Sequence, residues 1–295
     1  MTMQIGWELY RTFLGVLQEG SLSGAARALN LTQPTVGRHV SALEEALGLA
    51  LFTRSQAGLL PTDAALALRS HAEGMHITAA SLERVARGFG EGVRGTVRIS
   101  ASEVVGVEVL PPILAALQQV HPDLKVELVL SNKIQDLVRR EADIAVRMTS
   151  PQQEVLLATR VGNVVLGLHA HKAYLDRRGS PASVAELTQH SLIGFDQETP
   201  FLRSARSLLS PWTRDNFVLR CDSDLGQMAL MRAGAGIGIC QVALAKRDRD
   251  LVCVLPQKFS FELATWVAMH EDLRGSPRCR ATFDALVRGL RLYVR

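Results

Sequence analysis

Several features that would assign a chemistry are missing from this sequence. Its four cysteines are widely spaced, form no CxxC pair and have no histidine at ligand spacing, so we expect four reduced thiols and no metal site. No stretch reaches the roughly 18 apolar residues of a membrane-spanning helix. The first residues also lack the pattern of a signal peptide. The sequence therefore predicts a cytoplasmic protein without a membrane partner.

Motifs for catalysis and for cofactors are also lacking. Ser100 and Ser102 stand outside a GxSxG context, and His169 and His171 alternate along a predicted strand, so they cannot both face one pocket. The glycines of AGAGIGIC, residues 233–240, follow a predicted helix and precede a strand, which reverses the order of a dinucleotide-binding fingerprint. We expect no enzyme activity, no catalytic residue and no cofactor.

Positive charge is scarce at the N-terminal end. Residues 1–88 contain no lysine, and their seven arginines are balanced by seven acidic residues, although the whole chain carries a net charge of +4. If this region binds DNA, a few arginines on one face must do so, because the region carries no net positive charge.

The same region has the pattern of short consecutive helices. Apolar residues recur at helical spacing over residues 7–19 until Gly20 ends the run. Ser21 and Ser23 are both N-cap candidates for a second helix, which ends at Asn30, a residue suited to a left-handed turn.

A third helix is predicted to begin after Thr32, which caps it, with Pro34 in the first turn. Its buried stripe is predicted to contain Val36, Val40, Leu43 and Leu47. Its opposite face presents Gln33, Thr35, Arg38 and, more laterally, His39. This pattern is typical of a helix-turn-helix, in which glutamine can pair with adenine and arginine with guanine. From spacing alone, an ordinary three-helix packing unit remains the alternative.

The following segment predicts a hairpin and a long helix. Residues 49–62 contain a short apolar run, Arg54, a turn and a second apolar pair, so Arg54 could reach a phosphate or a minor groove. Thr62 caps a helix from Asp63 to about Gly88. The apolar positions of this helix suit a helical partner; they are Leu66, Ile77, Leu82 and Val85.

Residues 13–65 closely resemble the winged helix-turn-helix segment of LysR-type transcriptional regulators, whose total length is also similar. The resemblance rests on AARALNLTQPTV, LEEALG and the LF-x-R that follows. It implies that the third helix enters the major groove, that the wing grips the backbone, and that the long helix pairs two chains within a homodimer or homotetramer. The implied DNA-contacting residues are Gln33, Pro34, Thr35, Arg38 and Arg54. The chain departs from the family at Gly37, where a serine is usual.

Beyond the glycines of residues 88–95, short strands and helices alternate, which predicts a doubly wound parallel sheet. The predicted strands are 96–100, 124–131, 143–148, 164–170, 191–195, 217–221, 236–241 and 263–270. The predicted helices are 108–122, 133–142, 171–179, 224–235 and 279–294. The family resemblance implies a two-lobed effector domain, similar to a periplasmic binding protein, whose chain crosses between lobes near Val161 and Trp266.

Small ligands of open α/β sheets bind outside the C-terminal ends of the strands. The candidate effector contacts at these ends are Ser100, Ser102, Glu103, Asn132, Arg147, Phe195 and Ser223. Each could instead be a helix cap or a polar loop residue. Arg147 suits a carboxylate, whereas Glu103 and Asp224 would repel an anion, so the chemical class of the ligand stays open.

The complete prediction is an α/β protein of three parts. These are a winged helix-turn-helix domain (1–61), a linker helix and hinge (62–92) and an effector-binding domain (93–295), in which lobe I is 93–161 with 267–295 and lobe II is 162–266. We expect a transcriptional regulator that binds promoter DNA and a small-molecule effector, with RNA polymerase as a further partner. The alternative is a small-molecule binding protein whose N-terminal helices serve oligomerisation only. A redox sensor is disfavoured because no close cysteine pair is present.

Overall fold

The computed structural model describes residues 5–55, 58–87, 92–132, 142–151, 155–198 and 213–295. The chain forms two compact units, one ending at Ala86 and one beginning at Arg87. Over the described ranges, no helix combines the length and the apolar character needed to cross a membrane.

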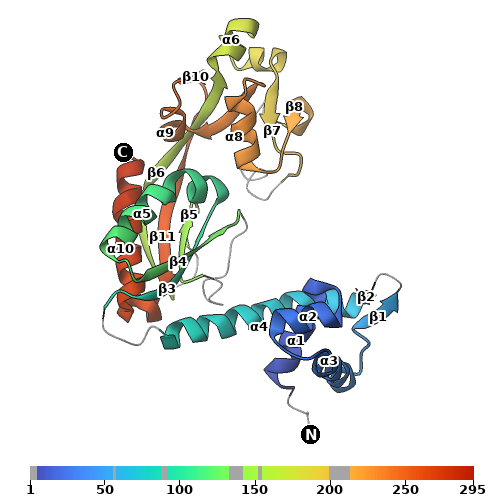
Figure 1. The fold of residues 1–295 in the computed structure, drawn as a ribbon. Helices are drawn as coiled ribbons and strands as arrows, with labels where there is room; N and C mark the ends of the chain where they lie inside the picture. Colours follow the sequence, from blue (N-terminus) through green and yellow to red (C-terminus); the bar gives the residue numbers. More distant parts are fainter. Residues whose placement is uncertain (1–4, 56–57, 88–91, 133–141, 152–154, 199–212) are drawn as a thin grey trace. The chain divides into compact units, whose positions relative to one another are not determined.

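The N-terminal unit is built from four helices and a hairpin (Figure 1). Its elements are α1 (Trp7–Glu19), α2 (Leu22–Leu29), α3 (Gln33–Leu47), β1 (Phe52–Ser55), β2 (Gly58–Pro61) and α4 (Asp63–Arg87). The predicted first helix and the predicted hairpin are confirmed, with Arg54 of β1 opposite Leu59 of β2.

Local capping fixes where the short helices begin and end. Ser21 caps α2, and its Oγ accepts the Gly24 N–H at 3.1 Å. The alternative cap, Ser23, was wrong because the helix already begins at Leu22. Asn30 takes the left-handed conformation predicted for it, with φ of 55°. Thr32 caps α3 and accepts the Thr35 N–H at 3.3 Å, as predicted.

One face of α3 is buried against the other helices. Val36, Val40 and Leu43 are buried as predicted, whereas Leu47 is only half-buried. His39 differs from the prediction of a lateral position on the exposed face, because its Nδ1 lies 2.9 Å from the buried Thr12 Oγ1 of α1. A side chain tied to a neighbouring helix in this way is held back from an external partner.

The long helix α4 leaves large apolar side chains in solvent. Leu66 is 51% exposed and Leu82 is 69% exposed, while Ile77 is half-buried. Met75 is also exposed, and it shares a helix face with Leu82 because seven residues separate them. The Val85 side chain lies outside the described part of the structure.

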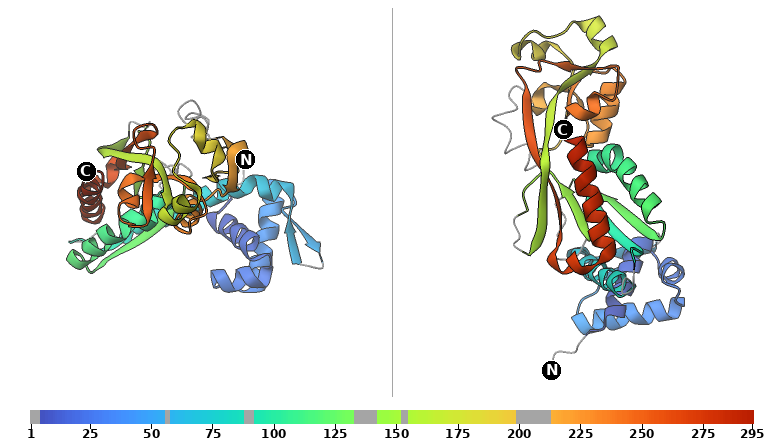
Figure 2. Two further views of the ribbon diagram at one scale, coloured as in Figure 1. Left: turned by 90° about the horizontal axis from the view of Figure 1, so that it is seen from above. Right: turned by 90° about the vertical axis from the view of Figure 1, so that its left-hand side faces the viewer.

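The larger unit is organised around one mixed sheet, nine-stranded over the described residues (Figure 2). Its strands are β3 (Gly95–Ala101), β4 (Leu124–Leu130), β5 (Ile144–Arg147), β6 (Leu156–His171), β7 (Leu192–Gly194), β8 (Phe217–Arg220), β9 (Ile237–Gln241), β10 (Leu251–Val254) and β11 (Ser260–His270). The order is β4-β3-β5-β11-β6-β9-β7-β8, and β10 pairs with β6. Parallel pairing joins β3 to β4 and β5, and β7 to β8 and β9. The strand–helix alternation therefore gives parallel pairs, as predicted, at both ends of the sheet.

Helices and helical turns connect and cover these strands. They are η1 (Val105–Val109), α5 (Leu110–Val120), α6 (Lys172–Arg178), η2 (Ala185–Gln189), η3 (Arg214–Asn216), α8 (Asp224–Arg232), α9 (Val242–Ala245), η4 (Glu271–Gly275) and α10 (Pro277–Tyr293). The element η1 is a turn of π-helix that leads directly into α5. The predicted helix over 133–142 falls outside the described residues, except for its last position.

Two long antiparallel strands, β6 and β11, pass through the middle of the sheet. Their register shifts between Thr265 and Trp266, and the residue paired with Thr265 is Gly162, with φ of 145°. A Cβ atom at position 162 would also lie 2.5 Å from Val294 Cγ2. Only glycine fits this conformation and this close approach, so the strand pair is irregular at a defined point.

The AGAGIGIC segment is a helix-to-strand turn, as predicted. Helix α8 ends at Arg232, Gly234 has φ of 71°, and β9 begins at Ile237. A Cβ atom on Gly236 would lie 2.2 Å from the Ser191 carbonyl oxygen, which accepts the Ile237 N–H. Gly236 is therefore needed where β9 approaches the chain leading into β7.

Candidate DNA interface and effector site

The N-terminal turn of α3 presents polar side chains away from the core. Gln33, Pro34 and Arg38 are exposed and Thr35 is half-exposed, while Val36 and Val40 are buried behind them. The first turn of a helix carries unpaired N–H groups and a partial positive charge, which favour phosphate. The face predicted to contact DNA is therefore accessible and combines hydrogen-bond donors with a cation.

Hydrogen bonds arrange these side chains into two groups. Thr35 Oγ1 lies 2.8 Å from Thr32 Oγ1, and Arg38 Nη2 donates to Thr35 Oγ1 at 3.5 Å. Separately, the Ser23 hydroxyl of α2 donates to Gln33 Oε1 at 3.2 Å. Sequence periodicity did not reveal the second contact, because it joins residues on different helices.

The remaining DNA candidate, Arg54, lies on β1 of the hairpin. Its backbone position is fixed by pairing with Leu59, whereas its side chain lies outside the described part of the structure.

Gly37 has no packing role in α3. A Cβ atom there would meet only Leu22 Cδ1, at 3.8 Å, which is ordinary van der Waals contact. A glycine inside a helix costs about 1 kcal/mol relative to alanine. The fold therefore accepts a larger residue at this position, and the reason for glycine lies outside the packing of the unit.

We predict that Gly37→Ser changes DNA affinity more than stability. Serine should raise the free energy of unfolding by about 0.5 kcal/mol, because its helix propensity exceeds that of glycine. Its hydroxyl lies beside Arg38 and should change the dissociation constant for a specific duplex by about fivefold or more. Thermal unfolding and fluorescence anisotropy on the same preparations measure the two effects, and Gly37→Ala is the matched control. A large shift in melting temperature with unaltered DNA binding would contradict this prediction.

Three of the predicted effector residues are brought together in the larger unit. The Glu103 N–H donates to Asn132 Oδ1 at 3.1 Å, and the Ser223 hydroxyl donates to Glu103 Oε2 at 3.0 Å. Asn132 Nδ2 also donates to Asp224 Oδ2 at 2.9 Å. These four residues follow β3, β4 and β8, so strand ends far apart in the sequence meet at one polar cluster.

Arg147 and Ser100 form a second pair at the end of β5. Arg147 Nη2 donates to Ser100 Oγ at 2.6 Å, and Nη1 donates to the Val146 carbonyl at 2.9 Å. Ser100 is fully buried, so its hydroxyl serves to position the guanidinium. Burial lowers the pKa of Arg147, because the interior disfavours the charged form.

The last two predicted residues are not joined to either group. Ser102 and Phe195 are half-buried. The Ser102 hydroxyl takes part in none of the side-chain hydrogen bonds found among the described residues, and Phe195 has no polar side-chain atom. Asp222, next to Ser223, accepts N–H groups from Asp196 at 2.9 Å and Gln197 at 2.8 Å. It therefore fixes the chain that follows Phe195.

Asp224 lies in an environment that disfavours its negative charge. Burial is the largest cause of its raised pKa, the charge of Glu103 adds to the shift, and the hydrogen bond from Asn132 opposes it. The native state therefore binds the proton of Asp224 more tightly than the unfolded chain does. This contribution to stability is complete below the unfolded pKa and is lost as pH rises through the folded pKa.

We expect Asp224→Asn to have a higher melting temperature than the wild type at pH 7.5. The difference between the two melting temperatures should be smaller at pH 4.5. The amide removes the buried charge, while its oxygen can still accept from Asn132. Melting curves across this pH range measure the effect, with Asp215→Asn, in the short helix η3, as control. A variant that is less stable than the wild type at pH 7.5 would contradict the assignment.

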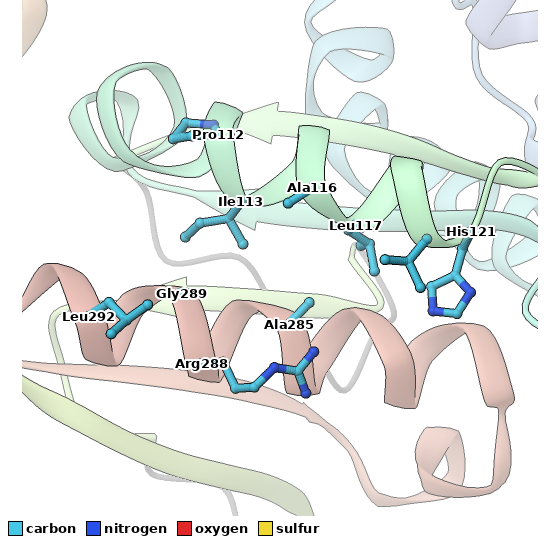
Figure 3. A pocket seen from close by; sticks show the side chains of 10 residues that line it. Pro112, Ile113, Ala116, Leu117, His121, Ala285, Arg288, Gly289 and Leu292 are labelled. Atoms are coloured by element: carbon cyan, nitrogen blue, oxygen red, sulfur yellow. The ribbon is translucent and has the colours of Figure 1, made fainter.

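A separate groove of about 410 Å³ lies between α5 and α10. Figure 3 shows Ile113 of α5 pointing toward α10, where Gly289 allows the two helices to approach closely. The residues lining it are Pro112, Ile113, Ala116, Leu117, Val120, His121, Ala285, Arg288, Gly289 and Leu292. None of the predicted effector residues lines this groove.

All four cysteines are free thiols. Burial raises the pKa of Cys240 to about 12, which keeps this thiol protonated, and its Sγ lies 3.4 Å from His169 Nδ1. His171 instead accepts the Ala173 N–H at the start of α6. Across the described ranges, histidine, cysteine and acidic side chains form no group of three that could hold a metal ion.

The fold defines a helix-turn-helix protein with an α/β domain, and comparison with family models identifies it further. Residues 7–66 match the model of the bacterial regulatory helix-turn-helix protein, lysR family, and residues 90–291 match the LysR substrate binding domain. The chain therefore belongs to the LysR family of bacterial regulators.

Related proteins are named as transcriptional regulators, and a solved structure has a similar fold. An HTH-type transcriptional regulator of Xanthomonas campestris is 29% identical over 181 residues, which are 60% of this chain and only 52% of that protein. The chain thus spans about half the length of that relative. The probable HTH-type transcriptional regulator LtrA of Klebsiella pneumoniae is 27% identical over 291 residues, covering 93% of this chain and 91% of LtrA. The structure of full-length CbnR complexed with target DNA has a TM-score of 0.67 at 19% identity, and the match covers 96% and 99% of the two chains. This last likeness supports the fold.

Proposed function

We propose that this protein is a sequence-specific DNA-binding transcriptional regulator whose promoter binding is modulated by a small-molecule effector. The observation that carries the proposal is the exposed N-terminal turn of α3, where Gln33 and Arg38 project from a helix anchored by buried Val36 and Leu43. Amide and guanidinium groups are the side chains that distinguish bases in the major groove. Family membership gives the same assignment.

The DNA contacts in this proposal are Gln33, Pro34, Thr35, Arg38 and, through the wing, Arg54. The balanced charge of residues 1–88 means that binding depends on these contacts rather than on a diffuse positive field. The proposal places the protein in the cytoplasm, where bacterial DNA lies, and includes RNA polymerase as a further partner. It assigns no catalytic step to the chain.

The domain boundaries belong to the same proposal. A DNA-binding domain covers 1–61, the linker helix and hinge cover 62–92, and the effector domain covers 93–295. Its two lobes, 93–161 with 267–295 and 162–266, would meet at the irregular point of β6 and β11. The positive φ of Gly162 and the register shift between Thr265 and Trp266 support this division. Exposed Met75 and Leu82 of α4 support pairing of two chains into a homodimer or homotetramer.

The effector would bind at the polar strand ends, where Glu103, Asn132 and Ser223 meet and where Arg147 is held by Ser100. Ser102 and Phe195 complete the proposed contact set. Hydrogen bonds from Ser223 to Glu103 and from Asn132 to Asp224 join segments far apart in sequence, so a ligand that replaces them would change how these segments are held. A ligand that prefers one arrangement by about 1–3 kcal/mol would shift DNA binding by a comparable amount.

DNase footprinting on the DNA that flanks the protein's own gene tests the proposal. The expected result is a protected segment with two half-sites, since a symmetric dimer presents two copies of α3. Protection should persist in the presence of excess unrelated DNA. A chain that protects no segment, even at low salt, is not a sequence-specific regulator.

A further inference from the structure

Ser23 has a hydroxyl that the fold does not use for capping. Ser21 caps α2, and Ser23 is an exposed residue of the first turn of that helix. Its hydroxyl donates to Gln33 Oε1, at 3.2 Å, and Gln33 is the first residue of α3. The bond therefore joins the start of one helix to the most N-terminal of the proposed DNA-contacting side chains.

This bond determines which end of the Gln33 amide is free. A glutamine amide has an acceptor oxygen and an NH₂ group with two donors. With Oε1 held toward Ser23, the amide nitrogen is the end left for another partner. The other polar residues of the turn are engaged separately, because Thr32, Thr35 and Arg38 contact one another.

The two purines of DNA differ in what they require from such an amide. Adenine presents the N7 acceptor and an N6 donor, so a bidentate contact needs both ends of the glutamine. Guanine presents the N7 and O6 acceptors, which need donors only. The Gln33 oxygen keeps a second lone pair, but the bond to Ser23 turns it toward α2. An amide held in this direction presents its two donors to a base and is therefore matched to guanine.

We propose that Ser23 is a positioning residue that makes Gln33 prefer guanine over adenine at the base pair it contacts. The proposal rests on the proposed DNA-binding function. It adds a specificity determinant on α2, outside the DNA contacts assigned above. Removing the Ser23 hydroxyl lets the Gln33 amide turn Oε1 toward the base, which allows the bidentate contact with adenine.

Competition binding with duplexes that differ at one base pair tests this proposal. The full chain is used, with a specific duplex obtained by selection from a random DNA pool, and Gln33→Ala first locates the base pair whose preference depends on Gln33. At that pair, wild type should favour guanine over adenine, and Ser23→Ala should reduce this ratio by about threefold to tenfold, a fraction of a full bidentate contact. Ser23→Thr, which keeps a hydroxyl, should restore the ratio.

Two controls separate this role from a structural one. Ser23→Ala should leave the melting temperature of the protein nearly unchanged, because the position is exposed and alanine favours a helix. In the Gln33→Ala background, Ser23→Ala should have no further effect on base preference, which makes the two changes non-additive.

The outcomes distinguish this inference from the function on which it rests. If wild type binds a specific sequence but prefers adenine at that pair, or if Ser23→Ala leaves the ratio unchanged, the role of Ser23 is overturned and the regulator remains. A specific sequence that shows no dependence on Gln33 also overturns it. Failure to select any specific sequence overturns the proposed function itself.

Discussion

Replacing Arg38 with alanine should reduce affinity for a specific duplex by roughly 5- to 150-fold, the range of one good base contact. Arg38 is exposed on the N-terminal half of α3, and the helix behind it is anchored by buried Val40 and Leu43. The loss should be concentrated on one base position, because an arginine that pairs with guanine discriminates only there. Fluorescence anisotropy with single-base duplex variants at fixed salt measures both quantities.

Arg69→Ala is the matched control for this experiment. Arg69 lies in the same compact unit, on α4, where it forms an exposed ion pair with Glu73 at 2.8 Å. Removing it takes away the same charge, so any loss of affinity should be small and equal for all sequences. If Arg38→Ala binds DNA as the wild type does, the N-terminal helices do not recognise bases. The alternative of an oligomerisation unit would then be preferred.

The second large effect concerns Gly236, where alanine should destabilise the effector domain by about 1–3 kcal/mol, toward the upper end of that range. The added Cβ would lie 2.2 Å from the Ser191 carbonyl oxygen and 3.0 Å from its carbon. These are backbone atoms, so relief requires β9 to move away from the residues leading into β7. Such a movement would weaken the hydrogen bond from Ile237 N–H to the Ser191 carbonyl.

Denaturant unfolding of the full chain measures this change in the free energy of unfolding. Gly275→Ala is the control, since a Cβ atom at that position meets nothing within 4 Å. The control should change stability by less than about 0.5 kcal/mol. Equal stability of the two variants would show that β9 is not held at this distance, and the account of the AGAGIGIC turn would be wrong.

The N-terminal unit could be predicted well because its signals are local. Thr32 and Pro34 mark the start of α3, and Asn30 marks the turn before it, through interactions within a few residues. Ser21 and Ser23 are both of a capping residue type and stand two positions apart, so the sequence did not decide which of them begins the helix. The contact of Ser23 with Gln33 depends on how two helices pack, and single-helix periodicity carries no such information.

The larger unit was harder to predict where strands depend on distant partners. The strand predicted over 164–170 actually begins at Leu156, because residues 156–163 are held by pairing with β11 rather than by their own alternation. The four-residue strand β10 was missed, since it exists only through pairing with the end of β6. The first error arises because the partner residues on β11 lie more than 100 positions away in the sequence. The second arises because β10 is too short to show a period.

The polar residues at the strand ends could also be predicted only in part. The rule that parallel strands end at a common edge placed Glu103, Asn132 and Ser223 among the candidates, and the structure brings them into hydrogen-bonding contact. The rule could not show that Ser100 would be fully buried and bonded to Arg147. Side-chain packing, rather than the position of a strand end, decides which of these residues remain available to a ligand.

We propose that this protein recognises a DNA sequence through the N-terminal turn of α3. The most direct test is the ratio of dissociation constants for a scrambled duplex and for the selected duplex, measured with the full chain at one physiological salt concentration. We expect a ratio of about 10³ or more for the wild type, and we expect it to fall by about tenfold in Arg38→Ala. A ratio near one for the wild type would contradict it.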